Sequence, residues 1–404
     1  MSEDKIKKDD NTNSNQEGNK LNGRGKVYGF PPKNILHHYN EPGFCPIDPL
    51  ADSTAIILLK ILKQNGINAW VEEIKQGPTF RQYKLGFERG TLKSAVLKHN
   101  NDFAQNLCVA SVRIIPPKPE NPFIIIEVPN ETRFTVGFDK MIDKLEASEA
   151  RIPMALGMDV DRDPLVIDVA LLRHMLLLGD TGSGKTICIH SLVSSILYSR
   201  APSQVRFLIA DLNDYELPVY NGIPHLLSPV ITEPEKALNA MGNLCSEMER
   251  RMILFRDNNM KSIGNYNEYA KDIQKPELPY IVFIIDEYEQ LMISYRKQFE
   301  YWIKRITTVA YFCGIHLIFS TKSLSKDIVS GVLSSNIPTV INFKIKDSDS
   351  ALTMIPKDAS NLLGRGDLLF SRPYTGETQR IQGSFIDPEI SEIVEFFKRQ
   401  TQNK

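Results

Sequence analysis

The sequence predicts an α/β fold with a parallel β-sheet, preceded by a small α+β domain and a disordered N-terminal tail. The pattern of apolar runs along the chain predicts the sheet. Short, uniformly apolar runs alternate with helical patterns over residues 155–387, and strands buried on both faces have this composition. The chain of 404 residues is 42% hydrophobic, which is enough to build the cores of two or three domains.

The predicted tail covers residues 1–27. Among the first 26 residues, Met1, Ile6 and Leu21 are the only larger apolar side chains, so the segment cannot bury enough surface to offset the entropy lost on ordering. Its lysines could contact DNA phosphates, but interleaved acids nearly cancel their charge, which favours a solvated tail.

Residues 28–150 have the pattern of a small α+β domain. Asp52 is a good helix cap for an apolar helical pattern, and Gly77-Pro78 separates two strand patterns as a turn. The predicted elements are a helix at 53–63, strands at 69–74 and 80–87, a helix at 92–107, and strands at 109–115 and 123–128. This order favours helices on one face of a sheet.

The third unit, residues 151–404, carries the predicted parallel sheet. Its five core strands are expected at 175–178, 205–210, 280–285, 315–320 and 339–343. Helical patterns follow at 187–197 and 235–255. In the second helix, Glu249, Arg250 and Arg251 are predicted to form a charged outer face opposite the apolar stripe.

A glycine-rich loop connects the first of these strands to its helix. The segment reads Gly-Asp-Thr-Gly-Ser-Gly-Lys-Thr and fits the phosphate-loop pattern G-x-x-x-x-G-K-S/T in the strand–loop–helix context that the motif needs. Its glycines allow backbone N–H groups to surround phosphates, and the helix N-terminus adds a positive dipole end. The predicted ATP-binding residues are Gly179, Asp180, Thr181, Gly182, Ser183, Gly184, Lys185 and Thr186.

Two acids follow the strand predicted at 280–285. Acids at the carboxyl end of a buried parallel strand face the ligand crevice, so Asp286 is predicted to hold Mg²⁺ together with the Thr186 hydroxyl. Glu287 is predicted to orient or deprotonate the attacking water, and Lys185 to contact the β- and γ-phosphates. The cofactors predicted are therefore ATP and Mg²⁺, and the predicted catalytic residues are Lys185, Asp286 and Glu287.

Composition limits the alternatives. A net charge of −1 gives no broad attraction to nucleic acid or to an anionic membrane. The five cysteines are far apart, without metal-ligand spacing, which is typical of a reducing compartment. No apolar run approaches the length of a membrane span and no signal-peptide pattern is found. The sequence predicts a cytoplasmic protein without a membrane span of its own.

Several further segments resemble the FtsK/SpoIIIE family of DNA-pumping ATPases, and they occur in the family's order. They are residues 205–211, 219–227, 247–251, 278–282, 313–317, 335–338 and 362–370. A weaker likeness extends to Gly77-Pro78 and the strand that follows. The resemblance implies that residues 28–150 form the family's α domain and that residues 151–404 form a RecA-like motor domain.

The resemblance also implies partners. Family members assemble as homo-oligomers, as hexameric rings around double-stranded DNA, and a membrane or DNA-processing protein is a further expected partner. The family's membrane region and winged-helix module are expected to be absent, which suggests an accessory or mobile-element translocase. Lys322 and Lys326, in the loop after the strand at 315–320, are the candidate DNA contacts, although a solvated loop is an equal alternative.

Small departures from the family pattern concern the chemistry. The usual Asp-Pro-Lys is Asp211-Leu212-Asn213 here, and the usual Thr-Gln-Arg-Pro-Ser is residues 321–325, Thr-Lys-Ser-Leu-Ser. Ser323 and Ala351 stand where the family usually has arginine. Loss of an arginine that stabilises the transferring phosphoryl group costs about 10³–10⁵ in rate. Either Lys322, Arg365 or Arg372 substitutes, or hydrolysis is slow.

The function predicted is ATP-driven movement along double-stranded DNA, in chromosome partitioning or in the transfer of mobile elements. The first alternative is an ATP-binding DNA clamp or coupling protein with weak or no pumping. The second is a P-loop switch that acts on a protein partner. The phosphate loop and the two acids alone do not separate these alternatives.

Overall fold

The computed structural model describes residues 20–21, 27–41, 43, 48, 50, 52–88, 93–118, 121–213, 215–323, 325, 327–346, 356–372 and 378–402. Most of the tail predicted at 1–27 lies outside the described residues, as do the DNA candidate Lys326 and the departure at Ala351. Of the tail, Lys20–Leu21 (β1) pairs antiparallel with Val27–Tyr28 (β2).

The larger of two main sheets contains the five predicted parallel strands. They are β10 (Val205–Asp211), β11 (Tyr280–Asp286), β12 (Ile315–Thr321), β9 (Met175–Leu178) and β13 (Thr339–Phe343), in that spatial order. All four pairings between them are parallel. The α/β fold and its five-strand core are therefore confirmed.

Four antiparallel strands extend this sheet beyond β13, and none of them was predicted. They are β14 (Asp367–Ser371), β15 (Thr378–Gly383), β7 (Pro153–Met158) and β8 (Pro164–Asp168), in that order. Proline and glycine within a short run weaken a strand pattern. Because β7 and β8 both begin with proline and β7 contains Gly157, local pattern does not reveal them.

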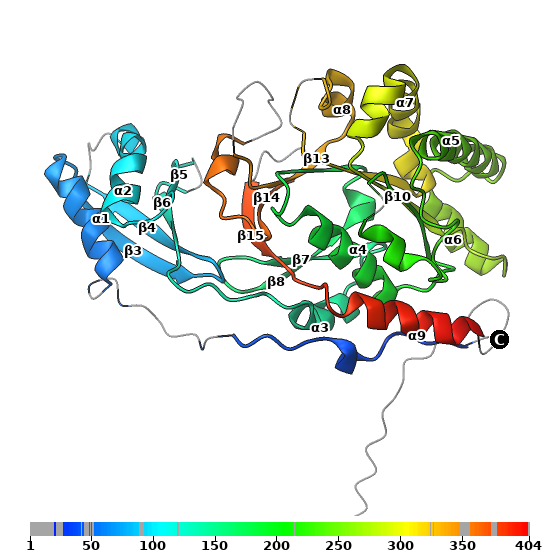
Figure 1. The fold of residues 1–404 in the computed structure, drawn as a ribbon, viewed down its shortest axis with the longest axis horizontal. Helices are drawn as coiled ribbons and strands as arrows, with labels where there is room; N and C mark the ends of the chain where they lie inside the picture. Colours follow the sequence, from blue (N-terminus) through cyan, green and yellow to red (C-terminus); the bar gives the residue numbers. More distant parts are fainter. Residues whose placement is uncertain are drawn as a thin grey trace, which may run out of the picture.

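Helices cover both faces of the larger sheet. In Figure 1, α5 (Pro234–Asp257), α7 (Glu289–Val309) and α8 (Gly331–Asn336) lie above it. The helices α3 (Ile142–Glu146), α4 (Lys185–Ser199) and α9 (Ile390–Gln402) lie below it, and α6 (Ile263–Asp272) follows α5. Short 3₁₀ helices are at Lys33–Ile35, Lys93–His99, Phe138–Met141, Val169–Leu171, Leu217–Tyr220, Ala310–Cys313 and Lys357–Asn361.

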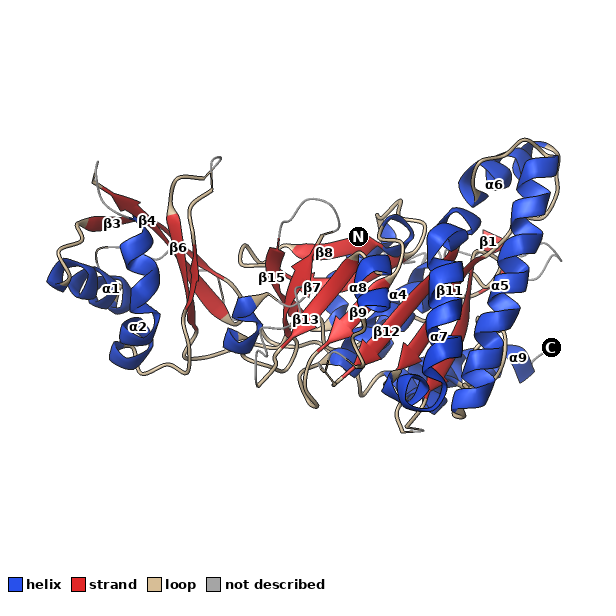
Figure 2. Cartoon of the chain, turned by 90° about the horizontal axis from the view of Figure 1, so that it is seen from above, coloured by secondary structure: helices blue, strands red, loops and turns tan. Residues whose placement is uncertain are grey.

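The smaller sheet is a separate four-stranded layer, at the left of Figure 2. Its order is β3 (Ala69–Gln76), β4 (Phe80–Phe87), β6 (Ile124–Pro129) and β5 (Arg113–Ile115), all antiparallel. Helix α1 (Ser53–Gln64) packs on β3 and on α2 (Asn100–Asn106). The Asp52 side chain caps α1 by accepting a hydrogen bond from the Ala55 N–H at 2.8 Å, as its sequence position predicts.

Two predicted elements of this small unit are shorter than expected. The helix predicted at 92–107 is α-helical only from Asn100, after a 3₁₀ segment. The strand predicted at 109–115 is extended only over β5. The Val109 N–H donates to the Ala104 carbonyl at 3.0 Å and so closes the end of α2. This N–H group is therefore unavailable for pairing with a strand.

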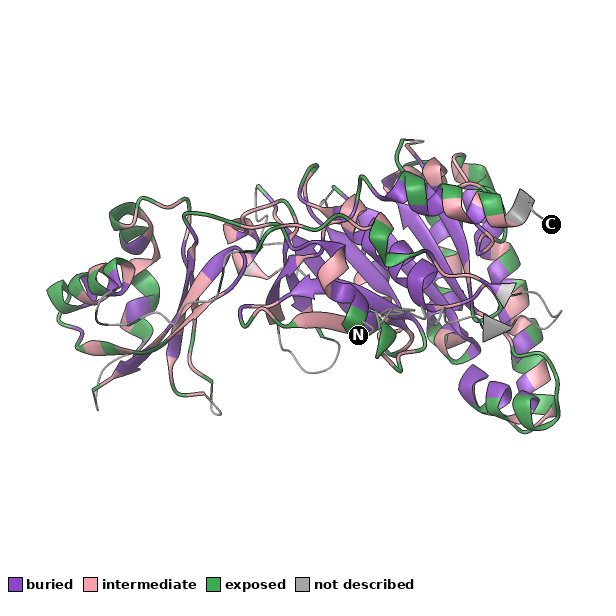
Figure 3. Cartoon of the chain, turned by 90° about the horizontal axis from the view of Figure 1, so that it is seen from below, coloured by how far each residue is buried: buried purple, intermediate pink, exposed green. Residues whose placement is uncertain are grey.

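The apolar side chains form two cores. The smaller one lies between α1, α2 and the four-stranded sheet, with members from Ala55 to Val128. The larger one surrounds the nine-stranded sheet, whose central strands are buried in Figure 3. Tyr28 and residues of the segment 136–145 pack in the larger core, although the sequence groups them with the small domain; the division at residue 150 stays a prediction.

Buried charges join the two sheets. Arg380 on β15 donates to Asp367 at 2.7 and 3.0 Å and to Glu127 on β6 at 2.9 Å. Arg113 on β5 contacts Glu127 at 3.3 Å and Asp358 at 3.0 Å. Although burial alone raises the pKa of Glu127, the charges of Arg380 and Arg113 outweigh it and hold that pKa below its usual value.

Candidate nucleotide site

Strand register brings the predicted acids and the glycine-rich loop to one edge of the sheet. Asp211 is paired with Asp286 across β10 and β11, and Leu178, at the end of β9, is paired with Thr321 at the end of β12. Because the carboxyl ends of parallel strands lie at the same edge, the loop after β9 and the acids after β11 face a common space. One strand, β12, lies between them.

The glycine-rich loop has the backbone that its composition predicts. Gly182 and Gly184 have φ values of +73° and +117°, in the left-handed region that favours glycine. A Cβ at Gly182 would have no heavy atom within 4 Å, whereas a Cβ at Gly184 would lie 2.7 Å from the Gly366 nitrogen. Gly184 therefore allows the close approach of a second loop, the one that contains Gly366. The Gly366 N–H also donates a hydrogen bond to the Ser183 carbonyl at 2.8 Å, which joins the two loops.

Lys185 is the first residue of α4 and is buried. Its Nζ donates to the carbonyls of Gly179 at 2.7 Å and Asp180 at 3.0 Å. Burial lowers the pKa of Lys185, while the nearby charges of Asp286 and Glu287 act in the opposite direction. A buried ammonium held by carbonyls is suited to binding an anion inside the loop.

The loop and the acids open into one cavity of about 740 Å³, a size typical of small-molecule sites. Its lining includes the predicted residues Thr181, Gly182, Gly184, Lys185, Thr186, Asp286 and Glu287. Three other predicted loop residues, Gly179, Asp180 and Ser183, are outside the lining but adjoin it through the hydrogen bonds of Lys185 and Gly366.

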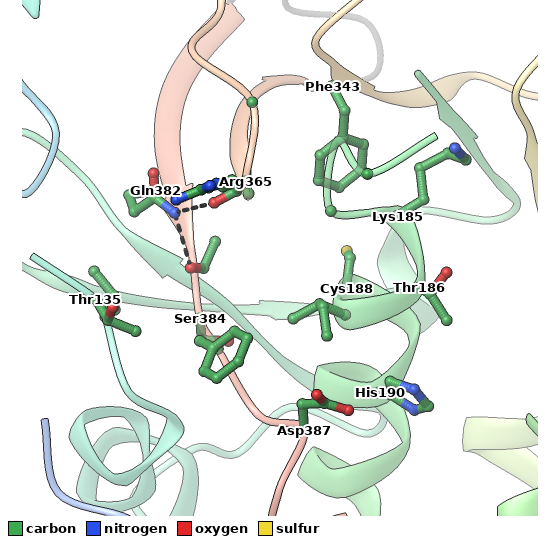
Figure 4. Close-up of a pocket in the computed structure, with 18 of the residues that line it drawn as sticks. Thr135, Lys185, Thr186, Cys188, His190, Phe343, Arg365, Gln382, Ser384 and Asp387 are labelled. Atoms are coloured by element: carbon green, nitrogen blue, oxygen red, sulfur yellow. Dashed lines mark hydrogen bonds between the residues drawn. The ribbon is translucent and has the colours of Figure 1, made fainter. Parts of the chain in front are cut away.

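The opposite wall of the cavity contains residues that the sequence analysis did not single out for nucleotide binding. Figure 4 shows Thr135, Gln382, Ser384 and Asp387 across the cavity from Lys185 and Thr186 on α4. The segments that carry them have no recognisable motif, so no local signal reveals them. They are brought to the cavity because Phe385 pairs with Val136 and Phe138 through hydrogen bonds of 2.7 and 3.0 Å.

Arg365 also lines the cavity and is exposed. It stands between Gly364 and Gly366, and all three residues have positive φ values, of +77°, +53° and +89°. Its carbonyl accepts a hydrogen bond from Gln382 at 2.9 Å (Figure 4). The Gly-Arg-Gly triplet is the local signal for this tight loop, and it places a guanidinium at the cavity.

The two acids after β11 differ in their surroundings. Asp286 is 8% exposed, and burial raises its pKa to about 6; a bound cation would favour its ionised form. Glu287 has a positive φ of +52° and a half-buried side chain that contacts Asn213 and Lys322. Asp211 has a different role, because one of its carboxylate oxygens accepts the N–H groups of residues 215, 216 and 217.

The described residues contain no group of three or more His, Cys, Asp or Glu side chains that could hold a metal ion. Thr186 and Asp286 both line the cavity and supply the oxygen ligands that Mg²⁺ prefers, with phosphate oxygens and water as the usual remainder. The donor set therefore fits a magnesium ion that arrives with a nucleotide.

The candidate DNA contact Lys322 lies at the end of β12, and its side chain is 45% exposed. Its Nζ is 2.8 and 3.0 Å from the two carboxylate oxygens of Glu287. In this arrangement Lys322 has a partner at the nucleotide cavity, and its role in DNA binding stays a prediction. Ser323 follows it and donates its backbone N–H to the Thr321 hydroxyl at 3.0 Å.

Among the helices in the described part of the chain, none combines the length and the apolarity that crossing a bilayer requires.

Two family models match the chain. The FtsK/SpoIIIE family model matches residues 141–326, and the FtsK alpha domain model matches residues 30–130. Among relatives, the DNA translocase FtsK of Staphylococcus aureus (strain Mu50) is 37% identical over 404 residues, covering 96% of this chain and 51% of the relative. The DNA translocase FtsK of Clostridium acetobutylicum is 36% identical, covering 93% of this chain and 50% of the relative.

Solved structures support the fold. The pCW3 conjugation coupling protein TcpA, in a monomer form with ATPγS, superposes with a TM-score of 0.59 at 18% identity, covering 87% of this chain and 100% of that one. EssC (ATPases 2 and 3) from Geobacillus thermodenitrificans gives a TM-score of 0.54 at 18% identity, covering 63% of this chain and 50% of that one. These neighbours confirm a P-loop ATPase fold.

The chain spans about half the length of the relatives it matches. Within that span, both family models match in the expected order and between them cover most of the chain, and identity to the relatives extends over nearly all of it. The chain therefore belongs to the FtsK/SpoIIIE family.

Proposed function

We propose that this chain is an ATP-dependent motor that moves along double-stranded DNA. The observation that carries the proposal is the convergence, in one cavity, of the phosphate loop after β9 and the Asp286-Glu287 pair after β11. Membership of a family of ATPases, and relatives named DNA translocases, support hydrolysis coupled to DNA.

The residues of the cavity divide the work. Lys185 and the loop N–H groups would hold the phosphates, and Thr186 and Asp286 would hold Mg²⁺, which neutralises charge on the phosphate oxygens. Glu287 accepts a proton from the attacking water as the water oxygen bonds to the terminal phosphorus and the bond to ADP breaks. Arg365 supplies a guanidinium from the same chain. Ser323, which stands where the family usually has arginine, does not.

DNA binding would depend on assembly. A net charge of −1 gives one subunit no broad cationic surface, so affinity has to come from local contacts repeated around a homo-oligomeric, hexameric ring. Such binding is expected to require oligomerisation, to be indifferent to base sequence and to weaken with salt as phosphate contacts are screened. A membrane or DNA-processing protein remains a proposed further partner.

The test is a pair of assays on the same preparation. ATP hydrolysis is expected to rise on addition of linear duplex DNA, and a triplex-forming third strand is expected to be displaced in an ATP-dependent way. Lys185→Ala should abolish both activities, while Lys304→Ala, on the exposed side of α7, should change neither. DNA-stimulated hydrolysis without displacement would replace the motor by the clamp or coupling protein, and hydrolysis indifferent to DNA would refute both.

A further inference from the structure

The carboxylate of Glu287 is held from two sides by the ends of the neighbouring strands. Lys322, just after β12, places its Nζ 2.8 Å from Oε2 and 3.0 Å from Oε1. Asn213, just after β10, contacts Oε2 through its side-chain Nδ2. Gln290, in the first turn of α7, fixes Asn213 in turn by donating to its Oδ1 at 3.0 Å.

The ion pair between Lys322 and Glu287 is partly shielded from water. The Glu287 side chain is 18% exposed, so water screens the interaction less than it does between fully exposed side chains. The hydrogen bond to Glu287 is the main cause of a raised pKa at Lys322, and burial opposes it. The lysine therefore stays an ammonium and keeps both carboxylate oxygens in its hydrogen-bonding reach.

The donors leave one acceptor direction open. A carboxylate has about four lone-pair positions. Among the residues that the structure describes, Lys322 uses one position on each oxygen and Asn213 uses a second one on Oε2, so the position without a described donor is on Oε1. A base with one open position can accept a proton from a water only along that direction, which is the geometric requirement for general-base catalysis.

We infer that Lys322 and Asn213 are positioning residues that orient the Glu287 carboxylate toward the attacking water. The inference rests on the proposed function, in which Glu287 is the base. Neither residue gains or loses a proton in the reaction: the water proton goes to Oε1, and the water oxygen forms the bond to phosphorus. Lys322 acts by fixing the direction of the carboxylate. The backbone of Glu287 also has a positive φ, which restricts its conformation.

The two side chains that contact Glu287 differ in chemistry. Lys322 supplies a cation and Asn213 supplies an amide. Exchanging these two side-chain types between the positions would keep one cation and one amide beside the carboxylate, so the paired substitutions Lys322→Gln and Asn213→Lys are expected to compensate for each other.

The first experiment measures steady-state ATP hydrolysis and nucleotide affinity in a substitution series. Lys322→Gln should lower kcat by about 10-fold to 100-fold, as expected for a misdirected catalytic group, with the KM for ATP and the binding of a fluorescent ATP analogue unchanged. Adding Asn213→Lys to Lys322→Gln should restore kcat to within a few-fold of the parent, and Lys322→Arg should retain most of it. Lys304→Gln is the matched control. A Lys322→Gln variant as fast as the parent or faster, or a double variant no faster than the single one, would overturn the inference.

The second experiment does not depend on turnover. Amine acetylation followed by mass spectrometry measures the reactivity of Lys322, which should increase several-fold in Glu287→Gln because the ion pair that keeps the amine protonated is lost. The reactivity of Lys304 should not change. Equal labelling of Lys322 in both proteins would show that the pair does not form and would refute the inference. Absence of DNA stimulation in the parent would instead refute the proposed motor. The ratios of kcat between the variants and the parent would still test the role of Lys322 and Asn213.

Discussion

At the scale of single residues, the proposed mechanism assigns binding and proton transfer to different residues of the cavity. Lys185 and Asp286 are buried beside the phosphate loop, whereas Glu287 is half-buried and oriented by neighbouring side chains. Charged groups that are buried in this way act on phosphates with less screening than in water. Removal of the base should therefore leave nucleotide binding intact.

Glu287→Gln tests this separation. Glutamine keeps the shape and hydrogen-bonding length of glutamate but cannot accept the water proton, so turnover should fall by about 10² or more. ATP affinity, measured by equilibrium binding of a fluorescent analogue, should stay within a few-fold because Asp286 and Lys185 are unchanged. Hydrolysis at the parental rate would remove Glu287 from the mechanism.

Ser323→Arg tests the missing guanidinium. If loss of the family arginine limits the chemical step, the added cation should raise kcat more than it changes the KM for ATP, because the new interaction forms mainly in the transition state. The matched change is Arg365→Ala, which removes one of the arginines that line the cavity. A parent whose steady-state hydrolysis responds to neither change would show that neither a cation at position 323 nor Arg365 limits the rate.

At the scale of elements, the strand–loop–helix unit depends on backbone conformation as much as on side chains. Gly182 and Gly184, in the loop after β9, both have positive φ, but of these two only Gly184 is packed against a second loop. The sequence motif does not distinguish the two glycines, whereas their surroundings do.

Gly184→Ala and Gly182→Ala form a matched pair of substitutions. At Gly182 the added methyl has free space, so the cost is the left-handed backbone alone, about 1–2 kcal/mol. At Gly184 the methyl would also meet the Gly366 backbone, so the loop must move. Gly184→Ala should lower the melting temperature and the ATP affinity by clearly more than Gly182→Ala, as thermal unfolding with and without nucleotide would measure. Equal effects would contradict the contact between the loops.

The long helix α5 shows where periodicity fails at this scale. The pattern predicts that Arg250 and Arg251 share a charged outer face. The structure confirms an exposed position for Arg250 but buries Arg251 to 1% exposure. Its guanidinium donates to the carbonyls of Pro279 and Cys313, at 2.9 and 2.8 Å, and to Glu247. Arg251 is a structural residue because those carbonyls come from segments that the helix pattern does not include.

At the scale of the whole molecule, the buried charges around Glu127 tie the small sheet to the antiparallel end of the large one. Arg380 is the centre of this cluster, because it bonds Asp367 on its own sheet and Glu127 on the other, and its guanidinium lies 4.3 Å from the centre of the Phe80 ring. Asp367 directly follows Gly366, which contacts the phosphate loop, so the cluster lies one residue from the nucleotide cavity.

Arg380→Met should destabilise the protein by about 3–5 kcal/mol, because it leaves the buried Asp367 without its cation and Glu127 with Arg113 alone. Arg399→Ala, which removes an exposed pair with Glu395 on α9, should cost at most about 0.5 kcal/mol. Urea unfolding followed by circular dichroism measures both effects. A similar loss in the two variants would show that the buried cluster does not join the sheets in solution.

The same cluster gives a dependence on pH. The pKa of Glu127 in the folded protein is below its usual value of 4.5, so its stabilising contribution is complete above about that pH and is lost as the pH falls through the folded value. The difference in stability between the parent and Arg380→Met should therefore be largest near neutral pH and shrink in acid. A difference that grows below pH 4.5 would reverse the sign of this linkage.

The sequence by itself determined the features that depend on neighbours along the chain. The phosphate loop, the five parallel strands, the cap at Asp52 and the acids after β11 all follow from residue types at short spacing, and the structure contains each of them. Segment order was sufficient to identify the family.

Only the tertiary structure decided which distant residues meet. Thr135 and Ser384 reach the nucleotide cavity because the segments on which they lie pair with each other, and Lys322 contacts Glu287 because β12 is the neighbour of β11. The antiparallel strands β7, β8, β14 and β15 likewise become visible only through their partners. The physical reason is that hydrogen bonding and burial between residues far apart in sequence depend on the order of strands in the sheet, which local propensity and periodicity do not encode.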